Sequence, residues 1–199
     1  GSGDGTADLA RRSGARLVHC RRGRGVQPAA GASRAKGDVL LFLHADSVVP
    51  AGALASINET LAARPAVMGG NFRLLFDGDD KFNRWVCGFY RWIRQRGFYY
   101  GDSGIFVRRR AYRALGGFRP IALMEDYDFT RQLEEFGETC CIEDPPLVTS
   151  SRRFRGRRPA AIVAGWLILH GLHHMGVPAP WLARLYNSER RAGGAAGGL

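Results

Sequence analysis

An imidazole and a carboxylate directly follow an uninterrupted apolar run. Val39–Leu43 contains no polar residue, and His44 and Asp46 come directly after it. Such a run is typical of a strand that is buried on both faces of a sheet. Because open α/β sheets bind ligands at the carboxyl ends of their strands, His44 and Asp46 are candidates to hold a ligand or a metal ion. The alternative is that Asp46 only caps a turn and His44 is a half-buried polar group.

Two further acidic positions could complete a reaction site. Asp102 lies in a glycine-punctuated segment, and Asp126 follows Glu125 at the start of a predicted helix. A carboxylate such as Asp46 can bind a divalent cation together with diphosphate oxygens, and that cation would stabilise a departing nucleoside diphosphate. Another carboxylate could take a proton from an attacking hydroxyl. We therefore expect Asp46, Asp102 and Asp126 to line one pocket that is suited to group transfer.

A structural role is the alternative for part of this acidic cluster. Carboxylates are favoured at a helix start, where the dipole and the free N–H groups are positive. We assign Asp128, in the same helical turn as Asp126, to helix capping rather than to catalysis.

The elements that must position these residues follow from periodicity and from breaker residues. The order from the N-terminus is a helix at Ala7–Arg12, a strand at Arg16–Cys20, a helix at Pro28–Lys36, the apolar strand, and a helix from Pro50 to Arg64. This alternation is typical of parallel βαβ units. A strand at Val67–Phe76 follows, in which Gly69 and Gly70 indicate a close approach of another backbone.

The second half of the chain predicts further helices and two short strands. Helical spacing covers Phe82–Ile93, Tyr127–Phe136, Ala160–Met175 and Pro178–Tyr186, and short strands are expected at Thr139–Ile142 and Leu147–Ser150. We expect the apolar helix Ala160–Met175 to dock on the core. Contact between its Ile162–Met175 part and a membrane surface is the alternative.

The strongly basic composition indicates anionic binding partners but does not identify them. The net charge is +11, and Lys36 and Lys81 are the only lysines, so nearly all cations are arginines, which suit bidentate contact with phosphate. Nucleic acid, an anionic membrane and a phosphorylated substrate are therefore all open as partners. We find no nucleic-acid-binding motif, and we expect that nucleic acid is not a partner. The four cysteines lack the spacing of a zinc site, and we interpret them as reduced. We find no apolar leader and no apolar run long enough to span a membrane, so we expect a cytoplasmic protein.

Four ordered segments together resemble family 2 of the glycosyltransferases, which have the GT-A fold. Gly1–Thr6 is similar to the end of their Asp-x-x-Ser-x-Asp-Gly-Thr segment, and Asp38–Asp46 to the strand that ends in their Asp-x-Asp metal motif. Gly101–Arg109 resembles their acceptor-side segment, and Gly116–Phe118 with Glu125–Asp128 resembles their Gly-Gly-Phe and Glu-Asp block. The forms Leu-His-Ala-Asp and Gly-Asp-x-Gly-Ile-Phe-Val-Arg-Arg are most similar to a bacterial subgroup that is named for radical-SAM/selenodomain gene neighbourhoods and arsenosugar biosynthesis.

The resemblance implies roles for individual residues. Asp126 matches the catalytic base of inverting members, and Glu125 beside it would position the acceptor or phosphate. Asp46 matches the last Asp of the metal motif, while His44 stands in place of the first and suits Mg²⁺ poorly. The implied cofactor is a divalent cation, Mn²⁺ or Mg²⁺, with a nucleoside-diphosphate sugar as donor. His44, Ala45, Asp46 and Arg24 would bind the donor and cation, and the acceptor would meet Gly101, Asp102, Ser103 and Gly104.

Some family features do not match. The family's first strand, with its Pro-x-x-Asn-Glu nucleoside-binding stretch, has no counterpart, and Ala29 stands where many relatives have Asn. We therefore expect an N-terminally truncated chain that lacks the first βα unit. Arg152–Phe154 matches the Gln-x-x-Arg-Trp motif of processive relatives only in part, so processivity is not implied.

These observations combine into one expectation and two alternatives. We expect an inverting, hexosyltransferase-like enzyme with a small-molecule or lipid-linked acceptor. Its fold would be α/β, a GT-A, Rossmann-like three-layer sandwich with a mixed, mainly parallel sheet. Residues 1–158 would form the catalytic domain, 159–190 a C-terminal helical extension and 191–199 a disordered tail. The alternatives are a GT-A fragment without donor binding, and a basic module that binds a membrane surface or nucleic acid.

Overall fold

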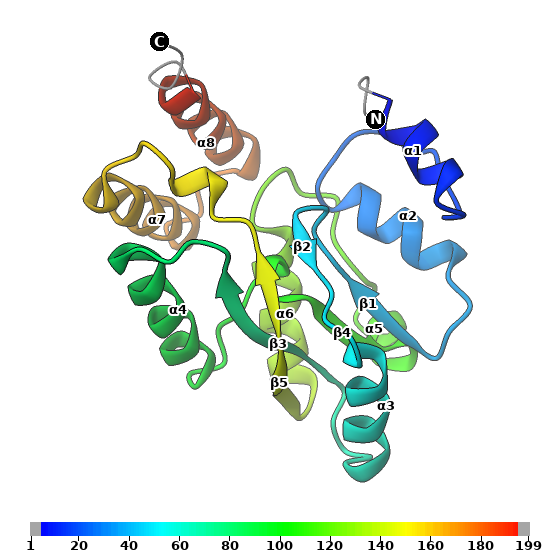
Figure 1. Ribbon diagram of the computed structural model, residues 1–199. Helices are drawn as coiled ribbons and strands as arrows, with labels where there is room; N and C mark the ends of the chain where they lie inside the picture. The colour runs from blue at the N-terminus through cyan, green and yellow to red at the C-terminus, as the bar shows by residue number, and fades with distance from the viewer. Residues whose placement is uncertain (1–4, 195–199) are drawn as a thin grey trace.

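A five-stranded mixed sheet forms the centre of the computed structural model, which describes residues 5–194 (Figure 1). The strands are β1 (Val39–Phe42), β2 (Ser47–Val48), β3 (Gly69–Phe76), β4 (Ile105–Arg108) and β5 (Thr139–Thr149), in the spatial order β1-β4-β3-β5-β2. The helices are α1 (Thr6–Arg12), α2 (Val26–Arg34), α3 (Ala53–Ala63), α4 (Lys81–Arg94), α5 (Arg109–Ala114), α6 (Glu125–Phe136), α7 (Pro159–His174) and α8 (Ala179–Gly194).

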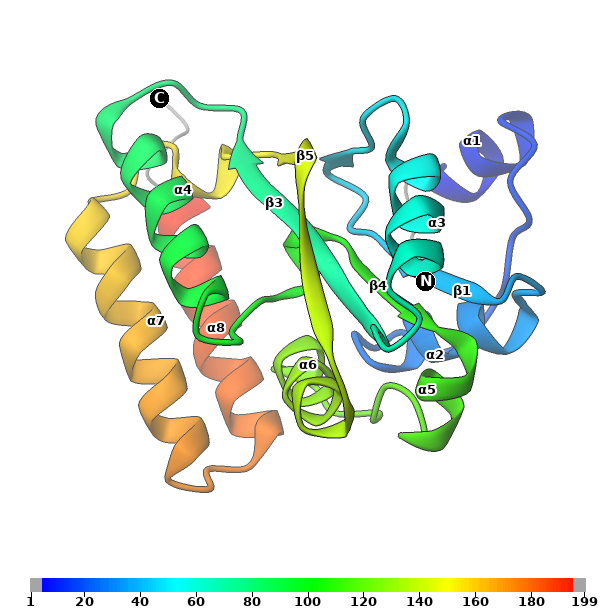
Figure 2. The same cartoon turned by 90° about the horizontal axis from the view of Figure 1, so that it is seen from below.

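Helices cover both faces of this sheet, so the three-layer α/β expectation is confirmed (Figure 2). One core cluster joins the sheet to α3, α4 and the start of α7, with Ile57, Val86 and Ile162 as buried members. The other joins the opposite face to α2, α5 and α6, with Tyr112 and Phe129 among its buried members. In the described part of the chain, no helix is long and apolar enough to cross a bilayer.

The strand directions correct the expected mainly parallel sheet. Among the described strands only β3 and β5 pair in parallel, and the other three neighbouring pairs are antiparallel. Arg16–Cys20, which was expected to add a parallel strand, has no regular secondary structure. The physical reason for the antiparallel β4 lies in the segment before it. This segment runs to the C-terminal end of β1, so β4 begins beside that end and runs back along β1. Phe42 therefore pairs with Ile105, and Val39 pairs with Arg108.

Local sequence signals account for the boundaries of several elements. The carboxylate of Asp80 caps α4 by accepting hydrogen bonds from the backbone N–H groups of Phe82 (2.8 Å) and Asn83 (2.9 Å). Gly70 in β3 marks a close backbone approach, as predicted, because a Cβ there would lie 1.9 Å from the Cys140 carbonyl oxygen. The two short strands expected after α6 form the single strand β5, which continues through Pro145 and Pro146.

The C-terminal helices pack against the rest of the chain. Ile162 of α7 is buried in the core, and Leu169 and Leu182 form a further cluster with Leu123, Met124 and Tyr127 at the start of α6. Of the segment 191–199 that was predicted to be a disordered tail, residues 191–194 end α8, and residues 195–199 lie outside the described residues.

Candidate active site

The turn after β1 carries His44 and Asp46, and β5 fixes its position. The backbone N–H of Ser47 donates to the His44 carbonyl over 3.2 Å and closes the turn. The Asp46 carbonyl accepts from the N–H of Ser150 at 3.1 Å, just after β5. The Asp46 carboxylate forms an ion pair with Arg152 (Oδ2 to Nη2, 3.2 Å), in which the two side chains are 33% and 69% exposed. This carboxylate is thus accessible, and its charge is balanced by an exposed guanidinium.

Gly101 brings an imidazole and a second carboxylate together. Its N–H donates to Asp126 Oδ2 over 2.9 Å. A Cβ on Gly101 would lie 2.6 Å from His44 Nε2 and 3.2 Å from Asp126 Oδ2. Because Gly101 has no Cβ, the His44 ring and the Asp126 carboxylate can both lie close to its backbone.

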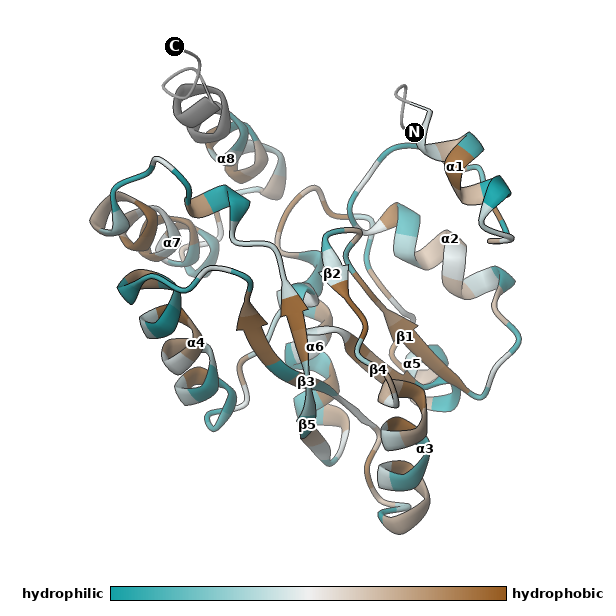
Figure 3. Cartoon of the chain, viewed as in Figure 1, coloured by the Kyte–Doolittle hydropathy of each residue, from teal (hydrophilic) through white to brown (hydrophobic). Residues whose placement is uncertain are grey.

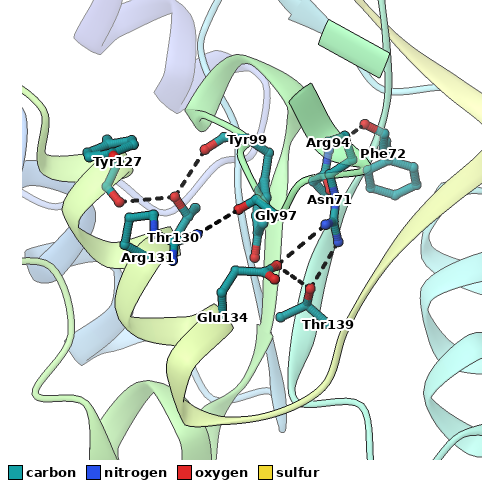
Figure 4. A network of polar contacts seen from close by, with 10 residues as sticks. All are labelled: Asn71, Phe72, Arg94, Gly97, Tyr99, Tyr127, Thr130, Arg131, Glu134 and Thr139. Atoms are coloured by element: carbon teal, nitrogen blue, oxygen red, sulfur yellow. Dashed lines mark hydrogen bonds and ion pairs between the residues drawn. The ribbon is translucent and has the colours of Figure 1, made fainter. Parts of the chain in front are cut away.

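A polar network holds the segment before Gly101, at Gly97 and Tyr99, against α6 (Figure 4). The Thr130 hydroxyl reaches the carbonyls of Tyr99 (3.0 Å) and Tyr127 (3.1 Å), and Arg131 donates to the Gly97 carbonyl over 3.3 Å. Nearby, Arg94 of α4 contacts Asn71, Glu134 and Thr139. The network couples α4, β3, β5 and α6, so the helical turns after Asp126 and the residues before Gly101 have little freedom to move apart.

The start of α6 has an unusual backbone. Met124 has φ 66° and ψ 21°, the left-handed region, and it is the one non-glycine residue with positive φ in the described chain. Strain of this kind persists where surrounding packing enforces it, and it concentrates at functional sites. Here the buried Met124 side chain packs beside Leu123 and Tyr127, and its backbone conformation begins the helical turn that presents Glu125 and Asp126.

Glu125 is a buried acid beside Asp126. Its Oε1 accepts from Arg24 Nε at 2.9 Å, whereas its buried Oε2 has no hydrogen-bond partner. Burial, followed by the charge of Asp126, raises the pKa of Glu125 above its ordinary value, although Arg24 opposes the shift. An unpaired buried oxygen and a raised pKa are features that a proton-handling or ligand-binding group would have.

A cavity of about 730 Å³ connects most of these groups. Its walls come from α2, β1 and the start of α6, and the predicted site residues that line it are Arg24, His44, Ala45, Gly101, Glu125 and Asp126. This volume lies in the range of small-molecule sites, about 300–1,000 Å³. Asp46 follows Ala45 but is not part of the lining.

The expectation that three acids line one pocket is wrong, because Asp126 lines the cavity but Asp46 and Asp102 do not. Asp102 points away from it. Its side chain is buried and points to α4 and to the segment after β5, where Oδ2 accepts from Arg153 Nη2 (2.6 Å) and from the Tyr90 hydroxyl (3.2 Å). The short 3-10 helix η1 (Gly101–Ser103) is the reason, because it turns successive side chains in different directions. Ser103 and Gly104, predicted with Asp102 to meet the acceptor, are also buried and do not line the cavity.

The sequence reasoning missed the partners of two acids. Arg152 and Arg153 are adjacent in the 3-10 helix η2 (Arg152–Phe154), yet they pair with Asp46 and Asp102 respectively. The arginine cluster at 152–158 was the available signal, because neither acid has an arginine or lysine within four residues along the chain.

The donor atoms present fit a divalent cation only if a ligand completes its shell. No group of three or more His, Cys, Asp or Glu side chains within the described residues is arranged to hold a metal ion. Mg²⁺ and related cations are commonly bound by one or two carboxylates, with phosphates and water as the remaining ligands. The accessible Asp46 carboxylate suits that arrangement, whereas the His44 ring lies with Gly101 and Asp126.

Comparisons with known proteins bear on these observations. The sequence model described as Glycosyl transferase family 2 matches residues 1–119. No curated protein matches the chain.

Among solved structures, a mannosyltransferase from Pyrobaculum calidifontis in complex with GDP-mannose and Mn²⁺ is similar, with a TM-score of 0.60 and 20% identity, and it covers 100% of this chain. Glucosyl-3-phosphoglycerate synthase from Mycobacterium tuberculosis, in complex with Mn²⁺, UDP-glucose and phosphoglyceric acid, has a TM-score of 0.54 and 17% identity over 89% of this chain. The chain spans 65% of the length of the first protein and 67% of the second. These likenesses confirm the expected GT-A, Rossmann-like fold.

Proposed function

The chain belongs to glycosyl transferase family 2, and we propose that it transfers a sugar from a nucleoside-diphosphate sugar to an acceptor hydroxyl with inversion at the anomeric carbon. The observation that carries the proposal is the convergence of Asp126, His44 and the Gly101 amide at a cavity of about 730 Å³ beside the end of β1. Solved relatives of the same fold contain Mn²⁺ with GDP-mannose or UDP-glucose, which supports this class of donor.

Asp126 is the proposed general base. The Gly101 N–H holds Oδ2, and the backbone N–H of Tyr127 donates to Oδ1 over 2.8 Å, so the carboxylate has a fixed orientation. As the acceptor hydroxyl attacks the anomeric carbon, its proton passes to Asp126 and the nucleoside diphosphate leaves from the opposite side of that carbon. Glu125 stays with Arg24 and positions the reacting groups.

Asp46 is the proposed protein ligand of a divalent cation, with His44 as its neighbour. When bound, that cation would neutralise charge on the leaving diphosphate. Arg24 lies in the cavity wall, where its guanidinium can contact a phosphate and Glu125 together. Ala45 adds backbone beside the donor, and Gly101 lies at the acceptor side.

A pair of neighbouring acids tests the assignment. Asp128 is in the same first turn of α6, but its carboxylate accepts from Arg119 (3.2 Å) and Gln132 (2.8 Å) and does not line the cavity. With Mn²⁺ and a panel of UDP- and GDP-sugars, we expect Asp126→Asn to lower turnover about 10²–10⁴-fold. Asp128→Asn should stay near the wild-type rate. Equal turnover of Asp126→Asn and the wild type would refute the role of Asp126.

A further inference from the structure

The outward side of α7 is apolar although nothing in the described chain covers it. The exposed residues of this helix are Pro159, Ala160, Ala161, Ala164, Leu167, Ile168, Gly171 and His174, of which only His174 is polar. Leu167 is 69% exposed, Ile168 52%, and Met175, which follows the helix, 73%. Figure 3 shows α7 largely in the brown of hydrophobic residues.

The opposite side of α7 already provides the contacts that the fold needs. Ile162 and Leu169 are buried, and Trp166 packs against Tyr90 and Phe154. The Tyr100 hydroxyl and His170 Nε2 are 2.8 Å apart. A surface helix with one side packed in this way normally has a polar outer side. Leu167 and Ile168 therefore call for an explanation other than folding.

The chain segment that contains α7 carries formal charges of one sign. Between residues 145 and 188 the chain has six arginines and no Asp or Glu. Arg155 and Arg158 are exposed just before α7. On α8, Arg184 lies over the ring of Trp181, which is 63% exposed. Exposed aliphatic side chains flanked by arginine and tryptophan are the composition of helices that lie in a membrane interface.

We propose that the outward side of α7, with Leu167, Ile168 and Met175, docks on the surface of an anionic lipid bilayer. The aliphatic side chains would enter the boundary between headgroups and acyl chains, while the arginines before α7 contact lipid phosphates. A second copy of the chain is the less favourable occupant, because a symmetric interface would bring arginines against arginines. A nucleic acid would use the arginines but not the aliphatic residues. The proposal does not depend on the transferase assignment.

Vesicle sedimentation provides the test, with Leu54 as a matched control. Leu54 on α3 is 69% exposed, the same fraction as Leu167. We expect the wild type to bind vesicles of equimolar phosphatidylglycerol and phosphatidylcholine, to bind pure phosphatidylcholine much more weakly, and to be released by salt. The double variant Leu167→Gln/Ile168→Gln should lose at least about tenfold in vesicle affinity. Leu54→Gln should bind like the wild type, and circular dichroism should show that both variants are folded.

Three results would overturn the proposal. The first is no binding of the wild type to the anionic vesicles, or equal binding to both vesicle types. The second is unchanged affinity of a folded Leu167→Gln/Ile168→Gln variant. The third is a lipid-free dimer, seen by light scattering, that this double variant dissociates, because the outward side of α7 would then be an interface between copies.

Discussion

Glu125 and Asp126 are adjacent acids with different surroundings. Asp126 accepts two backbone hydrogen bonds at the cavity, whereas Glu125 is buried with one oxygen paired to Arg24 and the other unpaired. Two carboxylates whose environments differ in this way can take different roles in one reaction. The proposed division gives proton transfer to Asp126 and positioning to Glu125.

Glu125→Gln should reveal the cost of this buried charge. The pKa of Glu125 is raised in the fold, mainly by burial, so the folded state holds its proton more strongly than the unfolded chain. The contribution of Glu125 to stability is therefore largest below its unfolded pKa and is lost as the pH rises through the folded pKa. As the pH rises from about 4 to about 7, the free energy of unfolding of Glu125→Gln should therefore increase relative to that of the wild type. Urea unfolding at both values measures this, and the opposite trend would contradict it.

Gly101→Ala should separate geometry from stability. The added Cβ meets the far end of the His44 side chain at 2.6 Å, so the ring can move aside at small cost, but the arrangement with Asp126 changes. A displacement of about 1 Å at a reacting group can lower the rate on the order of 10²-fold. In contrast, Gly88→Ala on α4 meets no atom within 4 Å, and it should leave activity unchanged and stabilise the fold by about 0.5–1 kcal/mol. Turnover assays and thermal melts of the two variants compare these effects, and equal activity would count against the proposed site.

At the residue scale, sequence reasoning succeeded where chemistry follows directly from a strand end or a helix start. His44 after β1 and Asp126 at the start of α6 are of this kind, and both line the cavity. It failed at Asp102, since the direction of a side chain in a 3-10 turn depends on a few backbone angles that composition does not specify. The left-handed Met124 was equally unpredictable, because its packing against distant residues enforces the conformation.

At the scale of elements, the segment between α4 and β4 determines the site. It crosses to the end of β1 before β4 begins, which makes β4 antiparallel to β1 and brings Gly101 to His44. Hydrophobic periodicity predicted β1, β3 and most helices because it reports burial. It does not report strand direction, which depends on the course of long connections, so the expectation of a mainly parallel sheet was wrong. The strand expected at Arg16–Cys20 did not form.

The element η2 offers a comparison between adjacent arginines. Arg153 pairs with Asp102, whose side chain is only 6% exposed, while Arg152 pairs with the accessible Asp46. Arg153→Gln would leave a buried carboxylate without its cation and should cost on the order of 3 kcal/mol. Arg152→Gln should cost only about 0–1 kcal/mol, since its pair faces solvent. Urea denaturation measures both values, and a similar loss in the two variants would contradict this account.

A double variant provides the control for the buried pair. Asp102→Asn/Arg153→Gln removes both charges, so it should recover a large part of the stability that Arg153→Gln loses. If the double variant were as unstable as the sum of the two single variants, the pair would not be coupled in the manner proposed.

At the scale of the whole molecule, the C-terminal helices are part of the packed structure. Ile162 joins the core beneath α3 and α4, and Leu169 and Leu182 pack with Tyr127 beside the proposed base. We therefore expect residues 159–187 to unfold together with the sheet. With Trp85 and Trp92 of α4 replaced by Phe, Trp166 and Trp181 report on α7 and α8 by fluorescence, and far-UV circular dichroism reports on the whole chain. The two urea transitions should coincide, whereas an earlier fluorescence transition would show an independently unfolding extension.

The central claim is that the cavity between α2, β1 and α6 binds a nucleoside diphosphate with a divalent cation at Asp46. Isothermal titration calorimetry with UDP and with GDP, each in the presence of Mn²⁺, tests this most directly. The account predicts saturable binding of one nucleotide per chain, weakened at least about tenfold by Asp46→Asn, which corresponds to about 1.4 kcal/mol. No saturable binding of either nucleotide to the folded wild-type chain, or equal affinity in Asp46→Asn, would contradict it.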